Sequence, residues 1–288
     1  MKRTGTRGLA ALALSGMKKT GVTLGAVVLA GATLALPAAA QIQQEGDSSY
    51  DAREACAGLP THFELKQALI AARGQVSAQT NGGLGNHMWA SIVNRDGIVC
   101  AVVYTGNGRG DQWPGSRVIA AQKANTANAF SLPGLALSTA NLYSAVQPGG
   151  SLAGLQASNP VNPEVAYRGS PRLNGEGNDP MVGGRIGGVN IFGGGLGLYT
   201  TGRRLIGGVG VSGDTSCADH SIAWRVRRLL ELDYLPNGVS GDAARPDNIV
   251  YDIVTAPGAS TGVSASGWGH PECGAASKTI AGELPARR

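Results

Sequence analysis

Several features that identify common functional classes are scarce in this 288-residue chain. Aromatic residues make up only 5% of it and charged residues 15%. Five of the 24 basic residues lie among the first 40 positions, where there is no acidic residue, and the other 19 balance the 19 acidic residues. A nucleic-acid-binding protein needs a basic surface to displace counterions from the phosphates. The balanced charge after position 40 therefore argues against nucleic-acid binding.

Motifs of several enzyme and cofactor classes are also missing. No Cys-x-x-Cys-His segment occurs, which argues against covalent attachment of haem. Ser212 lies in Gly-Val-Ser-Gly and not in Gly-x-Ser-x-Gly, and no nucleophile–base–acid set is visible. The glycine-rich segment 183–199 leads into a predicted hairpin, whereas a dinucleotide-binding loop leads into a helix. These absences favour a binding protein over an enzyme, and we predict no catalytic residue.

The first 40 residues have the features of an export signal. Lys18 and Lys19 precede an apolar run over residues 22–36, and small residues then form a cleavage site before Gln41. The apolar run is too short for a comfortable membrane span. We therefore expect an exported protein without a membrane span, located in the periplasm or outside the cell.

Hydrophobic periodicity and turn residues predict the order helix, hairpin, helix, long connection, hairpin, helix. Thr61 and Glu64 form a capping box that begins a helix extending to about Arg73. Two β-branched runs around the turn 95–97 predict the first hairpin, and a helix over about 116–130 follows it. In that helix, small residues at helical spacing form a face that allows close approach to the sheet: Ala120, Ala124 and Ala127.

The second half of this pattern predicts a hairpin that turns near Thr201-Gly202. A helix with one apolar face follows and extends to about Leu230. The complete order indicates an α/β (α+β) fold, with a mainly antiparallel sheet covered by helices.

Two regions extend beyond the predicted sheet and helices. Residues 143–190 are rich in Gly, Pro and Asn, and so long a connection is usually functional or an elaboration. Residues 248–254 are expected to add an edge strand, and residues 258–267 to form a flexible tail. We divide the chain into a signal peptide (1–40), an N-terminal tail (41–60), a domain (61–240, with the inserted segment 143–190) and a C-terminal extension (241–288).

The four cysteines allow two interpretations. In an exported protein they are expected to form two disulfides. Four cysteines allow three pairings, which the sequence does not distinguish, and we favour Cys56–Cys100 and Cys217–Cys273. The alternative is a tetrahedral zinc site, because Cys217 and Cys273 each stand three residues from a histidine: Cys217, His220, His270, Cys273.

The segment before and within the helix at 116–130 contains candidate ligand-binding residues. Arg109-Gly110-Asp111 spells a cell-adhesion tripeptide, which we interpret as a turn with Asp111 near the N-terminus of the helix. Lys123 is expected to pair with a ligand carboxylate, with Arg109 and Arg117 close to it in sequence. The alternative is that Lys123 is a solvated surface lysine.

Five separated segments carry a resemblance to a known family: "WASIVNRDGIVCAVVYTG", Arg109–Asp111, "SRVIAAQKANTANAF", "FGGGLGLY" and "LIGGVGVSGDTSCADHSIAWRVR". Over roughly residues 62–235 they resemble the GlcG/HbpS-like family, often labelled a haem-binding or haem-degrading domain. The resemblance implies a profilin-like fold that is frequently oligomeric, with several exported members that bind haem. The inserted segment and the C-terminal extension depart from shorter members.

The resemblance also implies where a ligand would bind. It carries over ligand-binding roles to Arg109, Asp111, Lys123 and Thr126, and to the turn at 213–219. It assigns no axial haem ligand. The chain offers four histidines for that role, of which His220 is best placed, at the start of a helix after a glycine-rich strand: His62, His87, His220 and His270.

We therefore expect an exported protein that binds haem or a related tetrapyrrole without covalent attachment, as a carrier or sensor and as a possible homo-oligomer. Two alternatives stay open. One is a binding module for a small molecule other than haem, and the other is a haem-degrading enzyme.

Overall fold

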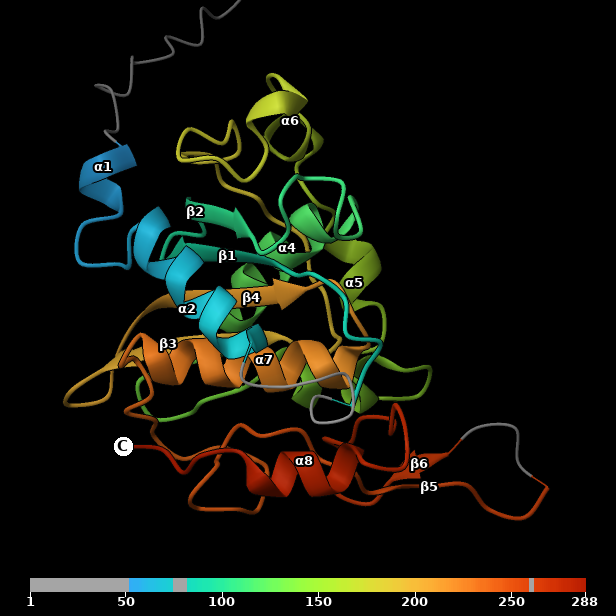
Figure 1. Cartoon of the computed structure of the whole chain (residues 1–288). Helices are drawn as coiled ribbons and strands as arrows, with labels where there is room; N and C mark the ends of the chain where they lie inside the picture. The colour runs from blue at the N-terminus through green and yellow to red at the C-terminus, as the bar shows by residue number, and fades with distance from the viewer. Residues whose placement is uncertain (1–51, 75–81, 259–261) are drawn as a thin grey trace, which may run out of the picture. The chain divides into compact units, whose positions relative to one another are not determined.

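Two hairpins combine into a four-stranded antiparallel sheet in the computed structural model of the chain (Figure 1). The strands, in the order β2-β1-β4-β3, are β1 (Trp89–Asn94), β2 (Val99–Tyr104), β3 (Gly195–Thr200) and β4 (Arg204–Ser212). The structure describes residues 52–74, 82–258 and 262–288. The predicted signal peptide and most of the predicted N-terminal tail lie outside these ranges.

Local turn chemistry explains both hairpins. In the first, the side-chain oxygen of Asn94 accepts hydrogen bonds from the backbone N–H groups of Asp96 and Ile98, at 2.9 and 3.0 Å. Gly97 follows with a φ of +75°, which favours glycine. The second hairpin turns at Gly202, with a φ of +80°, where the sequence predicts it.

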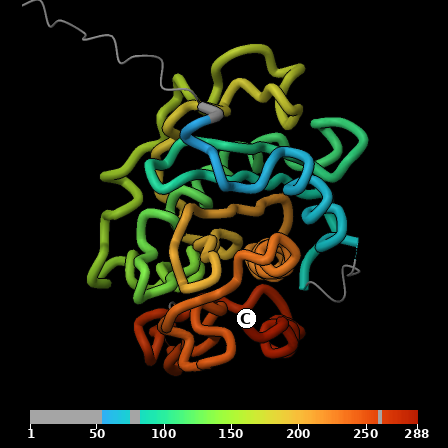
Figure 2. The backbone as a smooth tube through the Cα atoms, turned by 90° about the vertical axis from the view of Figure 1, so that its left-hand side faces the viewer, coloured from blue at the N-terminus to red at the C-terminus, as the bar shows by residue number. Residues whose placement is uncertain are grey.

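Helices cover both faces of the sheet (Figures 1 and 2). Helix α4 (Ser116–Phe130) packs on one face, and α2 (His62–Gly74) and α7 (Ser216–Leu229) pack on the other. A Cβ atom at Gly210 would lie 1.9 Å from the backbone oxygen of Ala120, so only glycine lets α4 approach β4 this closely. The α+β class and the predicted small-residue face of α4 are confirmed.

Two apolar cores lie between these layers. The core beneath α2 and α7 includes Leu65, Leu69, Ile92, Val103, Leu198, Val209, Val211, Ile222 and Val226. The core beneath α4 includes Trp89, Val93, Val102, Val118, Ala121, Met181 and Ile186. Burial of apolar surface on this scale is the dominant favourable contribution to folding.

The predicted capping box at the start of α2 is present. The backbone N–H of Thr61 donates to Glu64 Oε2 at 2.8 Å, and the N–H of Glu64 donates to Thr61 Oγ1 at 3.3 Å. The carboxylate of Glu64 accepts hydrogen bonds from the backbone N–H and from the hydroxyl of Thr61, and both lower its pKa. At the start of α7, Thr215 Oγ1 accepts from the N–H of Ala218 in the same way. A short helix, α1 (Ala52–Ala55), precedes α2.

The inserted segment covers the β2 edge of the sheet. After η1 (Thr139–Leu142) it contains η2 (Ser144–Val146), α5 (Leu155–Ser158), α6 (Pro163–Ala166) and η3 (Pro171–Leu173). Its last part pairs with the edge strand, because the N–H of Val99 donates to Gly184 O at 2.9 Å and the N–H of Gly183 donates to Val99 O at 2.8 Å. The segment is therefore an ordered part of the fold.

The C-terminal extension packs along α7 (Figures 1 and 2). It contains β5 (Ile253–Val254), β6 (Val263–Ser264) and α8 (Ser277–Glu283). The predicted edge strand over 248–254 is wrong, because β5 pairs only with β6 in a separate two-stranded ribbon. Asn248 instead bonds to Asn141 and Ala281, which holds its backbone away from the main sheet.

The expected flexible tail over 258–267 is only partly described, since residues 259–261 lie outside the described ranges. Its described part contains β6 and is held by Ser264, whose hydroxyl donates to Asp252 Oδ1 at 2.7 Å. No helix within the described ranges is long and apolar enough to cross a membrane.

Candidate functional site

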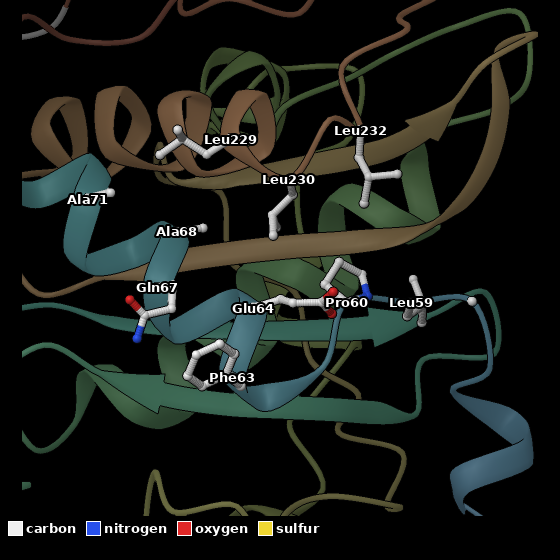
Figure 3. A pocket seen from close by; sticks show the side chains of 11 residues that line it. Leu59, Pro60, Phe63, Glu64, Gln67, Ala68, Ala71, Leu229, Leu230 and Leu232 are labelled. Atoms are coloured by element: carbon white, nitrogen blue, oxygen red, sulfur yellow. The ribbon is translucent and has the colours of Figure 1, made fainter.

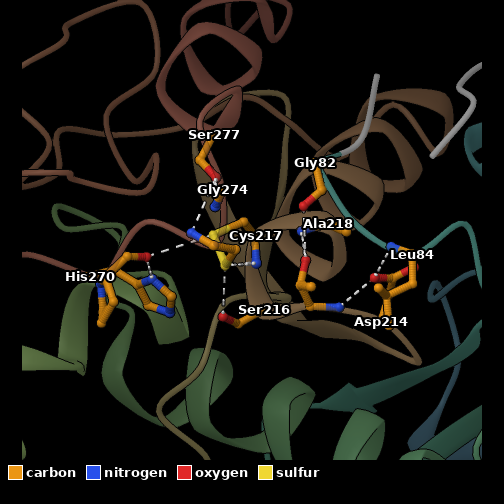
Figure 4. Close-up of a disulfide and its surroundings, with 12 residues drawn as sticks. Gly82, Leu84, Asp214, Ser216, Cys217, Ala218, His270, Gly274 and Ser277 are labelled. Atoms are coloured by element: carbon orange, nitrogen blue, oxygen red, sulfur yellow. Dashed lines mark hydrogen bonds between the residues drawn. A yellow bond between two sulfur atoms is a disulfide. The ribbon is translucent and has the colours of Figure 1, made fainter. Parts of the chain in front are cut away.

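Both predicted disulfides are present. Cys56 is joined to Cys100, and Cys217 to Cys273, with Cα–Cα distances of 5.5 and 6.0 Å. The second disulfide attaches the C-terminal extension to the first turn of α7 (Figure 4). The alternative zinc site is wrong, because a zinc thiolate site needs two free cysteine sulfurs and both of these are bonded to each other.

Lys123 is buried inside the protein and forms an ion pair there. Its ammonium donates to Asp219 Oδ2 at 2.6 Å and to the backbone oxygen of Val211 at 3.3 Å, and its side chain is only 2% exposed. The other oxygen of Asp219 accepts from the N–H of Asp214 at 2.9 Å. The surface-lysine alternative is therefore wrong. A ligand carboxylate at Lys123 would have to displace Asp219.

His220 lies on α7 next to this ion pair and is fully buried. Its Nε2 lies 3.2 Å from Asn248 Oδ1, which also accepts from a backbone N–H, so Nε2 carries the proton. Nδ1 therefore has a free lone pair, and it has no hydrogen-bond partner among the residues that the structure describes. Burial lowers the pKa of His220 to about 3, so the ring is neutral at pH 7.

His270, from the C-terminal extension, has a similar environment. Its Nδ1 donates to Pro271 O at 2.7 Å, which leaves Nε2 unprotonated, buried and without a partner. The ring packs against Tyr143 with a centroid distance of 5.2 Å. Burial lowers its pKa to about 4. The fold thus encloses two neutral imidazoles, each with one free nitrogen.

A second buried ion pair lies two turns further along α7. Arg227 donates through Nη1 and Nη2 to the two carboxylate oxygens of Asp247, at 2.6 and 2.9 Å, and neither side chain is exposed. The guanidinium also lies over the ring of Trp224, 4.6 Å from its centroid. We call these buried groups the polar cluster: Lys123, Asp219, His220, Arg227, Asp247, Asn248 and His270.

Two further predicted ligand residues, Arg117 and Thr126, lie on α4, the helix that also carries Lys123. Arg117 is buried and forms a two-point ion pair with Asp179 of the inserted segment. The hydroxyl of Thr126 is also buried, where it donates to Gln122 O at 2.7 Å and accepts from the N–H of Asn190 at 2.9 Å. Neither side chain presents a free polar group to solvent.

The Arg109–Asp111 turn is exposed, and it does not contact α4. Asp111 accepts from the backbone N–H groups of Asn107 and Gly108, at 2.7 and 3.0 Å. The predicted turn between strand and helix is present, and Asp111 lies five residues before α4 begins, where its carboxylate closes its own loop. Arg109 is exposed at the same loop.

Two other histidines considered as axial ligands make local hydrogen bonds. His62 Nε2 lies 2.9 Å from Gly175 O, and His87 Nδ1 lies 3.0 Å from Thr105 Oγ1. The six predicted ligand residues and four histidines therefore do not meet in one open cavity of the described structure.

An open groove lies elsewhere, between α2 and the end of α7 (Figure 3). It has a volume of about 650 Å³, within the range of small-molecule sites. Leu230 and Leu232 point toward Pro60 and Leu59 across it. We call it the α2–α7 groove; its lining residues are Gly58, Leu59, Pro60, Phe63, Glu64, Gln67, Ala68, Ala71, Leu229, Leu230 and Leu232.

Sequence reasoning missed most of this arrangement. Lys123 and Asp219 are 96 residues apart, and no spacing rule connects them. One signal for the groove was present in the sequence. Leucines continue beyond the last residue of α7, Leu229, at positions 230 and 232. Leu229 is 42% exposed, and Phe63 across from it is 69% exposed.

Comparison with known proteins links the chain to one family. The model of the family described as "Haem degrading protein HbpS-like" matches residues 63–227, more than half of the chain. This range contains the whole four-stranded sheet and α4, but ends before Asp247, Asn248 and His270. The C-terminal extension therefore supplies these three members of the polar cluster from outside the family match.

Three solved structures are similar to the chain, each with a TM-score below 0.5. A PduOC:haem complex is 26% identical, covering 58% of this chain and 89% of that one, with a TM-score of 0.39. The Klebsiella pneumoniae protein ORFY is 25% identical, covering 59% and 90%, with a TM-score of 0.39. HbpS is 19% identical, covering 59% and 89%, with a TM-score of 0.38. No curated protein sequence matches the chain.

Proposed function

We propose that this chain, which belongs to the HbpS-like family, binds haem or a closely related tetrapyrrole without covalent attachment. The observation that carries the proposal is the family match over residues 63–227, because it includes every strand of the sheet and the helix that covers one face. The family is described by its action on haem, and binding is the part of that action that needs no catalytic residue.

The buried histidines do not fit haem as an iron ligand. Haem iron is commonly bound by His, Cys, Met or Tyr, and both His220 and His270 have a free ring nitrogen. However, a Cβ atom at Gly193 would lie 2.9 Å from His220 Cβ, so the main chain packs directly on this side chain. Neither ring lines the α2–α7 groove. We therefore propose binding without a bond between these imidazoles and iron.

The ion pairs limit what the predicted ligand residues can do. Lys123 and Arg117 are each compensated by a buried aspartate. Direct ligand contacts by Arg109 and Asp111 stay a prediction, since both side chains are at the surface.

We also propose that the protein is exported and acts as a carrier or sensor. Disulfides persist in oxidising compartments, and all four cysteines of the chain are bonded. The predicted signal peptide at residues 1–40 agrees with this location. Haem degradation is the second candidate function, and the description of the family favours it.

The test is a titration of the purified protein with haemin, followed in the Soret region. We expect a shifted Soret band that saturates at a fixed stoichiometry. A spectrum equal to the sum of free haemin and protein at low micromolar concentration would contradict the proposal. Addition of ascorbate in air separates the two candidates, because a carrier keeps its Soret band and a haem-degrading enzyme loses it.

A further inference from the structure

The α2–α7 groove is an open and mainly apolar surface. Two helices and a loop form its walls, and the exposed side chains on opposite walls are Phe63 and Leu229. Monomeric proteins rarely leave large contiguous apolar surfaces in water unless they bind something. The groove therefore fits a ligand with a large apolar face.

A second hollow near the groove contains cationic side chains. It has a volume of about 270 Å³ and shares two lining residues, Gly58 and Leu59, with the groove. Two arginines line this hollow, Arg95 and Arg204, against a single carboxylate, Asp96. Arg95 donates to the backbone oxygen of Asn128 and, at 2.6 Å, to its side-chain oxygen.

Arg204 is the free cation of this pair. Its side chain is exposed at the first residue of β4, and it forms no ion pair with any residue of the described ranges. By contrast, Lys123, Arg117 and Arg227 are all paired inside the protein. An anionic group at the end of the groove would therefore meet an uncompensated guanidinium, which is a strong partner for a carboxylate.

One wall of the groove, the loop with residues 58–60, is held in place by the rest of the fold. The disulfide Cys56–Cys100 ties the loop that carries Gly58, Leu59 and Pro60 to strand β2. On the same loop, Asn94 Nδ2 donates to Ala55 O at 2.9 Å. A rigid wall lowers the entropy cost of ligand binding.

We propose that the α2–α7 groove binds the tetrapyrrole, with the apolar macrocycle between α2 and the end of α7 and its carboxylate edge at Arg204. This inference rests on the proposed function and adds the place and mode of binding. A tetrapyrrole such as haem has a flat apolar body and two carboxylates along one edge, which is the combination that the groove and the adjoining hollow present.

The lining of the groove also predicts whether the protein coordinates haem iron. It contains no His, Cys, Met or Tyr side chain, and its one carboxylate, Glu64, already accepts two hydrogen bonds from Thr61. The groove therefore binds the macrocycle and supplies no protein ligand to the metal. Metal-free protoporphyrin IX should bind with a Kd similar to that of haemin.

The experiment compares four variants by titration with haemin and with metal-free protoporphyrin IX. Arg204→Glu should weaken binding of both about ten- to a hundredfold, the loss expected for a charge-assisted contact. Leu229→Glu should weaken both by at least about tenfold, because it places a charge against the macrocycle. The matched controls are Arg172→Glu and Leu132→Glu, at exposed positions away from the groove, and they should keep the wild-type Kd.

The outcomes separate the two proposals. If the wild-type protein binds neither tetrapyrrole, the proposed function fails. If the wild-type protein binds them, and both Arg204→Glu and Leu229→Glu bind them with the wild-type Kd, the proposed function stands and the proposed binding site in the groove is wrong. Much tighter binding of haemin than of protoporphyrin IX would also overturn the groove, since iron ligation would then carry the affinity. If Leu229→Glu dissociates an oligomer and keeps the wild-type Kd, a second copy of the chain occupies the groove instead.

Discussion

The two ends of α7 contribute to two different environments. Its first turns contribute Asp219 and His220 to the polar cluster, which the C-terminal extension covers. Its last residue and those that follow contribute Leu229, Leu230 and Leu232 to an open apolar groove. The polar cluster has the chemical groups that a binding site needs, but its charges are already paired. The groove has few polar groups, but it is accessible, and the hollow that shares Gly58 and Leu59 with it contains Arg204, which has no ion-pair partner in the described ranges.

This difference shows that a cation in a family motif need not be a ligand contact. Lys123 stands in the segment that carries the family resemblance, and its charge stabilises Asp219 inside the fold. Arg204 stands at the first residue of β4, outside the five segments that carry the resemblance, and it has no ion-pair partner in the described ranges. The availability of a charge, which depends on its partners, decides whether it can bind a ligand.

The largest expected effect tests whether the polar cluster is structural. Lys123→Ala leaves the carboxylate of Asp219 buried without its cation, and breaking such a pair typically costs about 3–5 kcal/mol. We expect a loss of that order in the free energy of unfolding, measured by urea denaturation.

The control for this substitution is Lys278→Ala, because Lys278 is 60% exposed and pairs with Glu272 at the surface. An exposed pair of this kind is worth at most about 1 kcal/mol. Equal stabilities of Lys123→Ala and the wild-type protein would contradict the structural role and would return Lys123 to the candidate ligand residues.

The next expected effect is a loss of stability in mild acid that arises from the polar cluster. His220 and His270 have pKa values of about 3 and about 4 in the folded protein, below the ordinary value of 6.5, so the unfolded chain binds two more protons between about pH 6 and pH 4. Asp219 acts in the opposite direction, because burial raises its pKa from 3.8 to about 6 and the folded state holds its proton in this window.

The balance is one proton in favour of the unfolded state, so stability should fall by about 1.4 kcal/mol for each pH unit between about pH 6 and pH 4. Urea unfolding across this range measures the slope. His270→Gln removes one of the two histidines and should flatten it. A slope that is unchanged in this variant would show that His270 does not titrate on unfolding.

The sequence predicted what depends on local chemistry. Thr61 and Glu64 identified the start of α2, and glycines at 97 and 202 marked both hairpins, because capping and turn geometry depend on a few neighbouring residues. The expectation of two disulfides followed from the number of cysteines and the predicted export, which do not determine which cysteines pair. The edge strand at 248–254 was wrong because Asn248 bonds to distant segments, through its backbone oxygen to Asn141 and through its side chain to Ala281. Periodicity does not contain that information.

The candidate site was less predictable than the fold. The partner of Lys123 is 96 residues away and that of Arg117 is 62 residues away. Both pairings depend on how the layers pack, so the sequence could not show that these cations are compensated. The α2–α7 groove joins residues 58–71 with residues 229–232, two segments that meet only when α2 packs beside α7.

Hydrogen–deuterium exchange with and without haemin tests the account most directly, because it reports on both regions of the same protein. We predict that haemin slows exchange in residues 58–71 and 229–232, which line the groove, and leaves residues 119–127 and 216–224 around the polar cluster unchanged. Protection of residues 119–127 and 216–224 without protection of the groove segments would contradict the account, and would place the ligand beside Lys123 and His220.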